Sequence, residues 1–370
     1  MKLEDFCQIN PTVQLNRNEE YEFVEMADLV PGDRYVISKN KKVFNGSFSK
    51  FSNKDTLMAK ITPCLENGKI SQYIGASKAF GSTEFNIFRE KENISDANYL
   101  YYLVSSTIVK DPAIKSMSGA TGRQRANLDE IKQINVPDFN IATQEKIAKI
   151  LSNYDDLIEN NNKRIKILEE MAQKIYKEWF VDFKFPNHET VTFKQTDLGS
   201  EVMPIKGKNI TKAIIKKGNV PVVAGGIEPA YYHNIPNTVA PVITVSASGA
   251  NAGYINLYYQ DIWASDCSYI DTTMTPYVYY YYLLLKYNQI KVTNMQRGAA
   301  QPHVYPQDLA QLKIKIPEEN IIREFNEIIT PFFSEISNFS LKNQTLKQTR
   351  DLLLPRLISG EIDVENMGVK

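Results

Sequence analysis

The sequence predicts an α+β fold in which two globular modules are joined by two long helices that form an antiparallel coiled coil with pseudo-twofold repeat symmetry. Three observations predict it: short segments recur about 180 residues apart, a long helical pattern follows each repeated segment, and apolar residues recur in sevens along both patterns. With 370 residues, 43% hydrophobic and 23% charged, the chain is long enough for two or three domains with buried cores.

The repeat is visible in short segments that share one spacing. Tyr99–Val104 matches Tyr279–Leu284, and Ile134–Pro137 matches Ile314–Pro317, in both cases 180 residues later. Chance repetition of aromatic segments is the alternative, but agreement at one spacing over several marks argues against it. The chain therefore has the order globular part, helix, globular part, helix.

These marks divide the chain into four parts. We expect a first module over 1–141, a central long helix over 142–183, a second module over 184–318, and a distal long helix and tail over 319–370. Both modules mix short β-branched or aromatic runs with Gly and Asn turns and at least one short helix, which is typical of α+β domains. Within them, the pair Ile61 and Thr62 resembles the pair Ile243 and Thr244.

The central helical pattern predicts a long coiled-coil helix. It has no Gly or Pro between Ala142 and Phe180, and an apolar seam that starts at Ile147 recurs in sevens over five heptads. Charged residues, Asp155 among them, are expected on the outer face of this helix.

The distal pattern repeats the seam 178 residues later, but two prolines lie within it. Pro331 predicts a kink or restart near Thr330, and Pro355 predicts fraying or a turn before Leu357. Gly360 is expected to end the helix.

Each seam contains one polar residue, Asn161 in the central helix and Asn343 in the distal helix. One antiparallel register places these two side chains opposite each other and places Trp179 opposite Phe325. A buried Asn pair costs stability but fixes the register of a coiled coil. The alternative is two separate amphipathic helices, each packed on its own module.

Charge is unevenly distributed along a chain whose formal net charge is zero. Acidic residues are absent between positions 66 and 84, 111 and 129, 201 and 228, and 271 and 308, and each of these windows contains Lys or Arg. A neutral total counts mildly against nucleic-acid binding, but this distribution allows a locally basic face.

Motifs for catalysis are absent from the sequence. It contains no phosphate-binding loop, no glycine-rich turn for a dinucleotide or a methyl donor, and no nucleophile beside a histidine. The three cysteines are isolated, so we expect reduced thiols and neither zinc nor disulfides. We expect no secretory signal, and the longest apolar run is too short to cross a membrane. We expect a cytoplasmic, non-enzymatic binding protein without a cofactor.

Two polar loops at matching places in the repeat are the candidate DNA contacts. Ser118–Asn127 and Asn294–His303 are rich in hydrogen-bond donors, and Arg, Gln and Lys side chains can bond to base edges or neutralise phosphates. A solvated connector is the alternative for either loop alone, and a turn role is the alternative for the upstream candidates. The candidate DNA-binding residues are Lys60, Thr62, Lys69, Thr121, Arg123, Gln124, Arg125, Ser246, Ser248, Asn251, Gln296, Arg297, Gln301 and His303.

Nearly the whole chain resembles the specificity subunits of type I restriction-modification systems. Thr143–Leu151 and Tyr176–Phe183 resemble the central helical region of that family, and Leu352–Ile362 resembles its distal region. The segments Ile134–Pro137 and Ile314–Pro317, which precede the two helices, also fit the family.

This resemblance implies two target recognition domains that each read one half of a split double-stranded DNA site, with the helices setting the gap. It also implies two methylation subunits as partners, which supply the methyl donor and adenine N6 chemistry, and it allows two restriction subunits that use ATP to translocate and cleave DNA. Two other classes stay open: a standalone methyltransferase or nuclease, and a coiled-coil scaffold with two peptide-binding modules.

Overall fold

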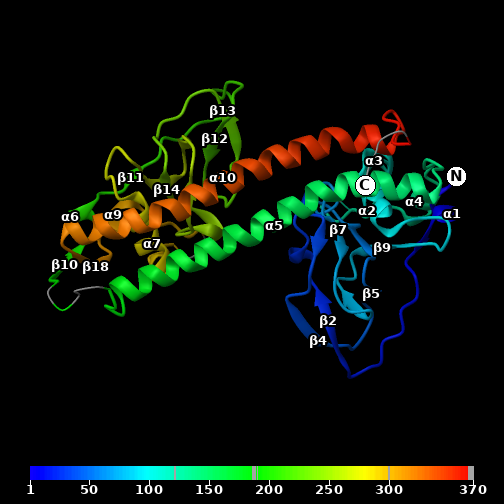
Figure 1. The fold of residues 1–370 in the computed structure, drawn as a ribbon, viewed down its shortest axis with the longest axis horizontal. Helices are drawn as coiled ribbons and strands as arrows, with labels where there is room; N and C mark the ends of the chain where they lie inside the picture. Colours follow the sequence, from blue (N-terminus) through cyan, green and yellow to red (C-terminus); the bar gives the residue numbers. More distant parts are fainter. Residues whose placement is uncertain (121, 186–188, 190, 299–300, 366–370) are drawn as a thin grey trace. The chain divides into compact units, whose positions relative to one another are not determined.

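The computed structural model describes residues 1–120, 122–185, 189, 191–298 and 301–365. It contains two compact units: the first comprises Met1–Asn161 with Leu341–Lys370, and the second comprises Asn162–Ser340. The long helices α5 (Ile141–Phe180) and α10 (Glu319–Ile358), labelled in Figure 1, each contribute one part to each unit.

The described residues of the first unit form two sheets, one of which has buried central strands. Strands β6 (Thr56–Ala59) and β7 (Ile70–Tyr73) have every residue buried, because helices cover one face and the second sheet the other. The main sheet has the order β1 (Cys7–Ile9), β9 (Phe85–Glu90), β6, β7, β3 (Tyr35–Val36), and the second has the order β4 (Asn40–Val43), β2 (Glu20–Val24), β8 (Ala79–Gly81), β5 (Ser49–Phe51). Its short helices are α1 (Leu3–Phe6), η1 (Met26–Asp28), α2 (Ala97–Ser105), α3 (Thr107–Lys115) and α4 (Leu128–Lys132).

The second unit has three sheets and its own set of short helices. The strands are ordered β11 (Ile205–Lys206), β17 (Cys267–Ile270), β14 (Val242–Ser246), β15 (Ile255–Tyr258) in one sheet; β13 (Tyr231–His233), β12 (Val220–Val223), β16 (Trp263–Ala264) in the next; and β10 (Phe193–Asp197), β18 (Lys313–Pro317) in the last. The helices are α6 (Leu198–Glu201), η3 (Gly249–Asn251), α7 (Val278–Tyr287), α8 (Gln289–Thr293) and α9 (Pro306–Ala310).

The two units share one topology, which confirms the repeat. In the first, β2 pairs antiparallel with β4 and parallel with β8; in the second, β12 pairs antiparallel with β13 and parallel with β16. The sheet order β1-β9-β6-β7 corresponds to β11-β17-β14-β15. The predicted α+β class with two modules and two long helices is thus confirmed.

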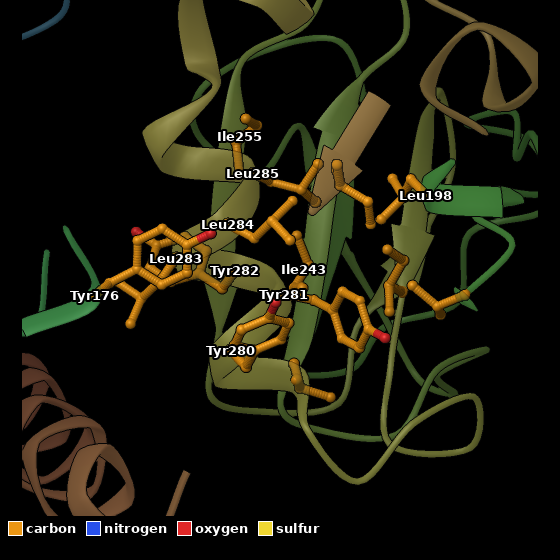
Figure 2. Close-up of a cluster of buried hydrophobic side chains, with 14 of the residues drawn as sticks. Tyr176, Leu198, Ile243, Ile255, Tyr280, Tyr281, Tyr282, Leu283, Leu284 and Leu285 are labelled. Carbon is orange, nitrogen blue, oxygen red and sulfur yellow. The ribbon is translucent and has the colours of Figure 1, made fainter. Parts of the chain in front are cut away.

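The core of the second unit forms around α7. Figure 2 shows the side chains from Tyr280 to Leu285 grouped with Ile243 of β14 and Tyr176 of α5. Seven of the ten residues of α7 are buried, so this helix is apolar nearly all round, as expected for an element enclosed in a core. The matching helix α2 has the same character in the first unit.

The long helices pair antiparallel inside each unit. In the first unit, Asn161 is bonded to Asn343 and Asp155 is paired with Arg350. In the second, the ring of Phe325 lies 5.6 Å from that of Trp179, and Phe339 contacts Arg164. Residue numbers rise on one helix as they fall on the other, so the alternative of two helices packed separately is wrong.

The predicted restart of the distal helix near Thr330 and the predicted turn before Leu357 are both wrong. Helix α10 continues through Pro331 and through Pro355 to Ile358, without a restart at Thr330 or a turn before Leu357. Proline in a helix removes one N–H donor and crowds the preceding turn. The helix can continue through an exposed proline when the packing of its other residues offsets the lost backbone hydrogen bond. Pro331 is exposed, whereas Phe333 two residues later is buried.

A charged residue expected on the outer face of the central helix proves to be buried. Asp155 is 4% exposed, because it accepts hydrogen bonds from Tyr102 of α2 and Arg350 of α10. Among the described helices, none is both long enough and apolar enough to cross a membrane. No group of His, Cys, Asp or Glu suited to a metal ion occurs within the described part of the chain.

Candidate nucleic-acid interface

The first candidate loop is a short hairpin closed at its base by Ser118 and Arg125. The backbone N–H of each residue donates to the carbonyl of the other, at 3.0 and 2.9 Å. The hairpin lies against the segment that leaves β6: the Ala126 N–H donates to the Lys60 carbonyl at 2.8 Å, and the Thr62 N–H donates to the Gln124 carbonyl at 3.0 Å. The loop is therefore held at its base by backbone hydrogen bonds.

The second candidate loop is held in the same way in the second unit. Arg297 and His303 exchange backbone hydrogen bonds of 2.8 and 2.9 Å. The Val304 N–H donates to the Ala247 carbonyl at 3.0 Å, and the Gly249 N–H donates to the Pro302 carbonyl at 3.1 Å. Ala247 and Gly249 follow β14 as Lys60 and Thr62 follow β6, so both units hold a donor-rich loop on the exit of the same strand.

These bonds correct one expected equivalence. Thr244 lies inside β14, where it pairs with Asn256 and Tyr269, whereas Thr62 lies beyond the end of β6. The position equivalent to Thr62 is Gly249. Ile61-Thr62 and Ile243-Thr244 are alike as dipeptides, but β14 continues to Ser246. Their similarity therefore does not place them at equivalent positions of the fold.

A carboxylate lies beside each loop. It belongs to the residue immediately before the strand that pairs with β6 in the first unit and with β14 in the second. In the first unit, the Lys60 N–H donates to the Glu84 carbonyl at 2.9 Å, and the Glu84 carboxylate binds the Arg125 guanidinium. In that pair Nε donates to Oε2 at 2.9 Å and Nη2 donates to Oε1 at 2.7 Å. Hydrogen bonding from Arg125 lowers the pKa of Glu84, which keeps this carboxylate ionised.

The second unit places Asp266 at the corresponding position. The Ala247 N–H donates to the Asp266 carbonyl at 3.2 Å, and the Ser248 hydroxyl donates to the Asp266 carboxylate. A second carboxylate, Asp308 at the start of α9, is buried and forms an ion pair with Arg297. Arg297 itself remains largely exposed, with 67% of its side chain accessible.

Other loop side chains project outward. Arg123 and Gln301 are exposed, and neither side chain has a hydrogen-bond or ion-pair partner among the residues that the structure describes. His303 stacks on Tyr305, with ring centroids 5.6 Å apart and planes 10° apart. Each unit thus presents a loop that combines donors held by carboxylates with donors that have no side-chain partner in the described part of the chain.

A sequence model of the type I restriction modification DNA specificity domain matches residues 1–170 and again residues 188–348. The chain belongs to this family. The two matches correspond to the two repeats, so each half of the chain carries one specificity domain.

Curated relatives of this specificity subunit agree. The specificity subunit of the type I restriction enzyme MjaIX from Methanocaldococcus jannaschii is 27% identical over 304 residues, which cover 73% of this chain and 70% of that protein. A putative MjaX specificity subunit from the same organism is 23% identical, covering 84% of this chain and 79% of that protein. Specificity subunits are non-catalytic, and catalysis in these systems resides in other subunits.

A solved structure shows the same fold. The S subunit of a type I restriction-modification system from M. genitalium aligns over 97% of this chain and 95% of that chain, with a TM-score of 0.56 and 17% sequence identity.

Several candidate residues of this specificity subunit bond to its own backbone. Lys69 donates through Nζ to the Met26 carbonyl at 2.8 Å, Gln296 donates to the Ala252 carbonyl at 2.8 Å, and the buried Ser246 hydroxyl donates to the Gly225 carbonyl at 2.8 Å. These three side chains therefore bond within the protein. Of the remaining candidates, Asn251 ends η3, and Thr121 lies outside the described residues.

Sequence reasoning missed the carboxylates that hold the loop donors. Asp308 ends the acid-free window that contains Arg297, so the sequence contained a signal for that pair, whereas Glu84 ends a different window from the one that contains Arg125. Whether an acidic residue pairs with Arg125 or Arg297 depends on where the strands and helices of the fold place it.

Proposed function

We propose that this chain recognises double-stranded DNA with a split target, reading one half through the first loop and the other half through the second. In this proposal, residues 1–141 and 184–318 are target recognition domains, and the helices in 142–183 and 319–370 set the gap between half-sites. The observation that carries the proposal is the repeated hydrogen-bond pattern that presents a donor-rich loop on the exit of β6 and of β14.

The chemistry of the loops fits DNA better than it fits a peptide. Arg and Gln side chains form paired hydrogen bonds to guanine and adenine edges, and unpaired Arg and Lys side chains neutralise phosphates. Arg123, Gln124, Gln301 and His303 supply both kinds of group on short loops held at their bases. Two such loops in one chain match a target of two halves.

We also propose that the chain positions two methylation subunits, and in systems that cleave DNA two restriction subunits, and that it binds no cofactor of its own. The methyl donor and ATP would then be bound by those partners. On this view, the isolated chain transfers no methyl group to DNA and hydrolyses no ATP, which distinguishes it from a standalone methyltransferase or nuclease.

Mapping of methylated adenines tests the proposal. Genomic DNA from cells with the methylation subunit is compared with and without this chain, and we expect methylation at one split sequence only when the chain is present. The purified complex should bind that sequence with an affinity that falls steeply as salt rises. Methylation that is unchanged without the chain, or binding that does not depend on salt, would count against DNA recognition and favour a scaffold.

A further inference from the structure

Two arginines of the first loop, only two positions apart, have different surroundings. Arg125 is held by the Glu84 carboxylate through Nε and Nη2, with half of its side chain still exposed. Arg123 is exposed and has no side-chain partner within the described part of the loop. The two residues therefore form a matched pair. One arginine is oriented by a carboxylate, and the other has no such partner in the described part of the loop.

The geometry of the Arg125 contact leaves the outer edge of its guanidinium open. A guanidinium carries five N–H donors in one plane, and the carboxylate occupies the edge made by Nε and Nη2. The remaining proton on Nη2 and one proton on Nη1 point outward in parallel. This is the donor pair that binds O6 and N7 of guanine in the major groove.

The charge of Arg125 is already balanced. Glu84 stays ionised because the guanidinium lowers its pKa, so the pair has no net charge to attract a phosphate. Release of counterions from DNA depends on the phosphates that a protein neutralises, and a balanced pair adds little to that number. Arg123 carries an unbalanced charge and adds a full phosphate contact.

We propose that Arg125, oriented by Glu84, reads a guanine in the first half-site, and that Arg123 contacts the phosphate backbone without reading sequence. This assignment rests on the proposed function, and it divides the labour inside one loop. Glu84 acts as a positioning residue: it fixes the plane of the guanidinium and cancels its charge.

The second unit has a counterpart built from different residues. Arg297 is held by the buried Asp308, and Ser248 is held by Asp266, which occupies the position of Glu84. Gln301 has no partner among the described residues. Arg297 is accordingly the oriented arginine of the second half-site.

The test uses the complex of the full chain with its methylation subunits. A randomised duplex library first gives the preferred sequence, and the affinities for that duplex and its single-base variants are then measured over a range of salt concentrations. The variants are Arg125→Ala, Arg123→Ala as the matched control, and Glu84→Gln, which keeps the side-chain shape but removes the charge. Thermal unfolding of each variant shows that it is folded.

Three distinct results are expected. Arg125→Ala lowers discrimination for guanine at a single position by roughly 5- to 150-fold, and this loss of discrimination distinguishes it from Arg123→Ala, because the salt slope also falls when Glu84 is left without its counter-charge. Arg123→Ala weakens binding to all sequences and reduces the slope of log affinity against log salt by about one, with the preferred sequence unchanged. Glu84→Gln lowers discrimination at the same position as Arg125→Ala and increases the slope by about one, since Arg125 becomes an unbalanced cation.

The contrary results separate two failures. If Arg125→Ala behaves as Arg123→Ala does, or if Glu84→Gln changes neither discrimination nor slope, the assignment of Arg125 is wrong while the loop remains a DNA contact. If neither arginine variant changes affinity, discrimination or slope, the loop is not a DNA contact and the proposed function fails at this loop.

Discussion

At the scale of single residues, the pair Asn161 and Asn343 shows what a heptad pattern can predict. The Asn161 amide donates to the Asn343 side-chain oxygen at 2.8 Å in the first unit, which is the pairing that the antiparallel register predicts. Both are buried, at 9% and 7% exposure. The sequence was sufficient here, because an antiparallel register that aligns the apolar layers leaves only one place for the two amides.

Replacing this pair tests its cost. Asn161→Leu or Asn343→Leu alone should lower the free energy of unfolding by about 1–3 kcal/mol, because one buried amide loses its partner. The double variant should be at least as stable as the natural chain but less specific in register. Urea unfolding of the three variants measures this, and a double variant less stable than both single variants would contradict it.

The ion pair between Asp155 and Arg350 shows what the heptad pattern could not predict. The carboxylate accepts from the Tyr102 hydroxyl and from Arg350 Nη1, both at 2.5 Å, and Arg350 also donates to the Gly32 carbonyl. The positions 178 residues away hold Phe333 and Ala172, and Phe333 stacks on Tyr279 with ring centroids 4.5 Å apart. One unit thus uses a polar contact where the other uses an apolar one, and only the fold brings the polar partners together.

Removing one member of the ion pair should be costly. Asp155→Ala or Arg350→Ala leaves a buried charge without its main partner, and each should lower the free energy of unfolding by about 3–5 kcal/mol. The double change Asp155→Leu with Arg350→Met should cost less than either single change, because no unpaired charge remains. Denaturant unfolding monitored by circular dichroism measures all three. Single variants that cost less than the double would show that the pair is not coupled.

At the scale of elements, the sequence predicted helices better than sheets. Periodicity predicted α5 and α10, because repeats of 3.6 and 3.5 residues are properties of one segment. Strand order is a property of distant segments. Strand β9 lies between β1 and β6, and β8 pairs with β2 across more than fifty residues of chain, which no local pattern encodes.

The proline in α10 shows that a local rule can be overridden by packing. On both sides of Pro331 the helix packs into the core of the second unit, to which it belongs, through Ile329 and Phe333. Thr330 donates through its hydroxyl to the Asn326 carbonyl at 2.6 Å, which adds a bond in the turn that the proline weakens. Tertiary contacts therefore maintain the helix where the sequence alone suggests an end.

Pro331→Ala tests this balance. Because the side chain is exposed and the helix continues, alanine restores the missing N–H donor to the Glu327 carbonyl and removes the crowding. We expect the free energy of unfolding to rise by about 1–3 kcal/mol. Urea unfolding measures it, with Pro355→Ala as a comparison near the helix end. A decrease in stability at position 331 would mean that the helix bends at the proline in a way that its core contacts require.

At the scale of the whole molecule, the repeat indicated which two loops to consider as the candidate site, but it did not show which of their side chains bond to the protein itself. Loop position in each repeat and donor chemistry selected Arg123, Arg125, Arg297 and His303 from the sequence. Three further candidates, Lys69, Ser246 and Gln296, proved to bond to the protein's own backbone. Composition alone cannot separate a side chain that faces solvent from one that supports a turn.

The repeat also predicts a division of effects between half-sites. Arg123→Ala and Arg125→Ala should change binding only at the half-site read by residues 1–141, and Arg297→Ala and Gln301→Ala only at the other. The reason is that each pair of residues belongs to a different unit. Binding by the assembled complex to DNA altered in one half-site at a time measures this. Equal effects of the first pair on both halves would refute the assignment.

The division of the two long helices between the units has a consequence for how the chain folds during synthesis. The second unit is one continuous stretch, Asn162–Ser340, and all of it is synthesised before Leu341 is added. The first unit needs Leu341–Lys370, which supply Arg350 to Asp155 and place Leu357 and Ile358 in its core. Domains usually fold in the order of their synthesis. In this protein the segment made first is completed last, and a nascent chain that stops before Leu341 would expose the buried face of α5 in the first unit.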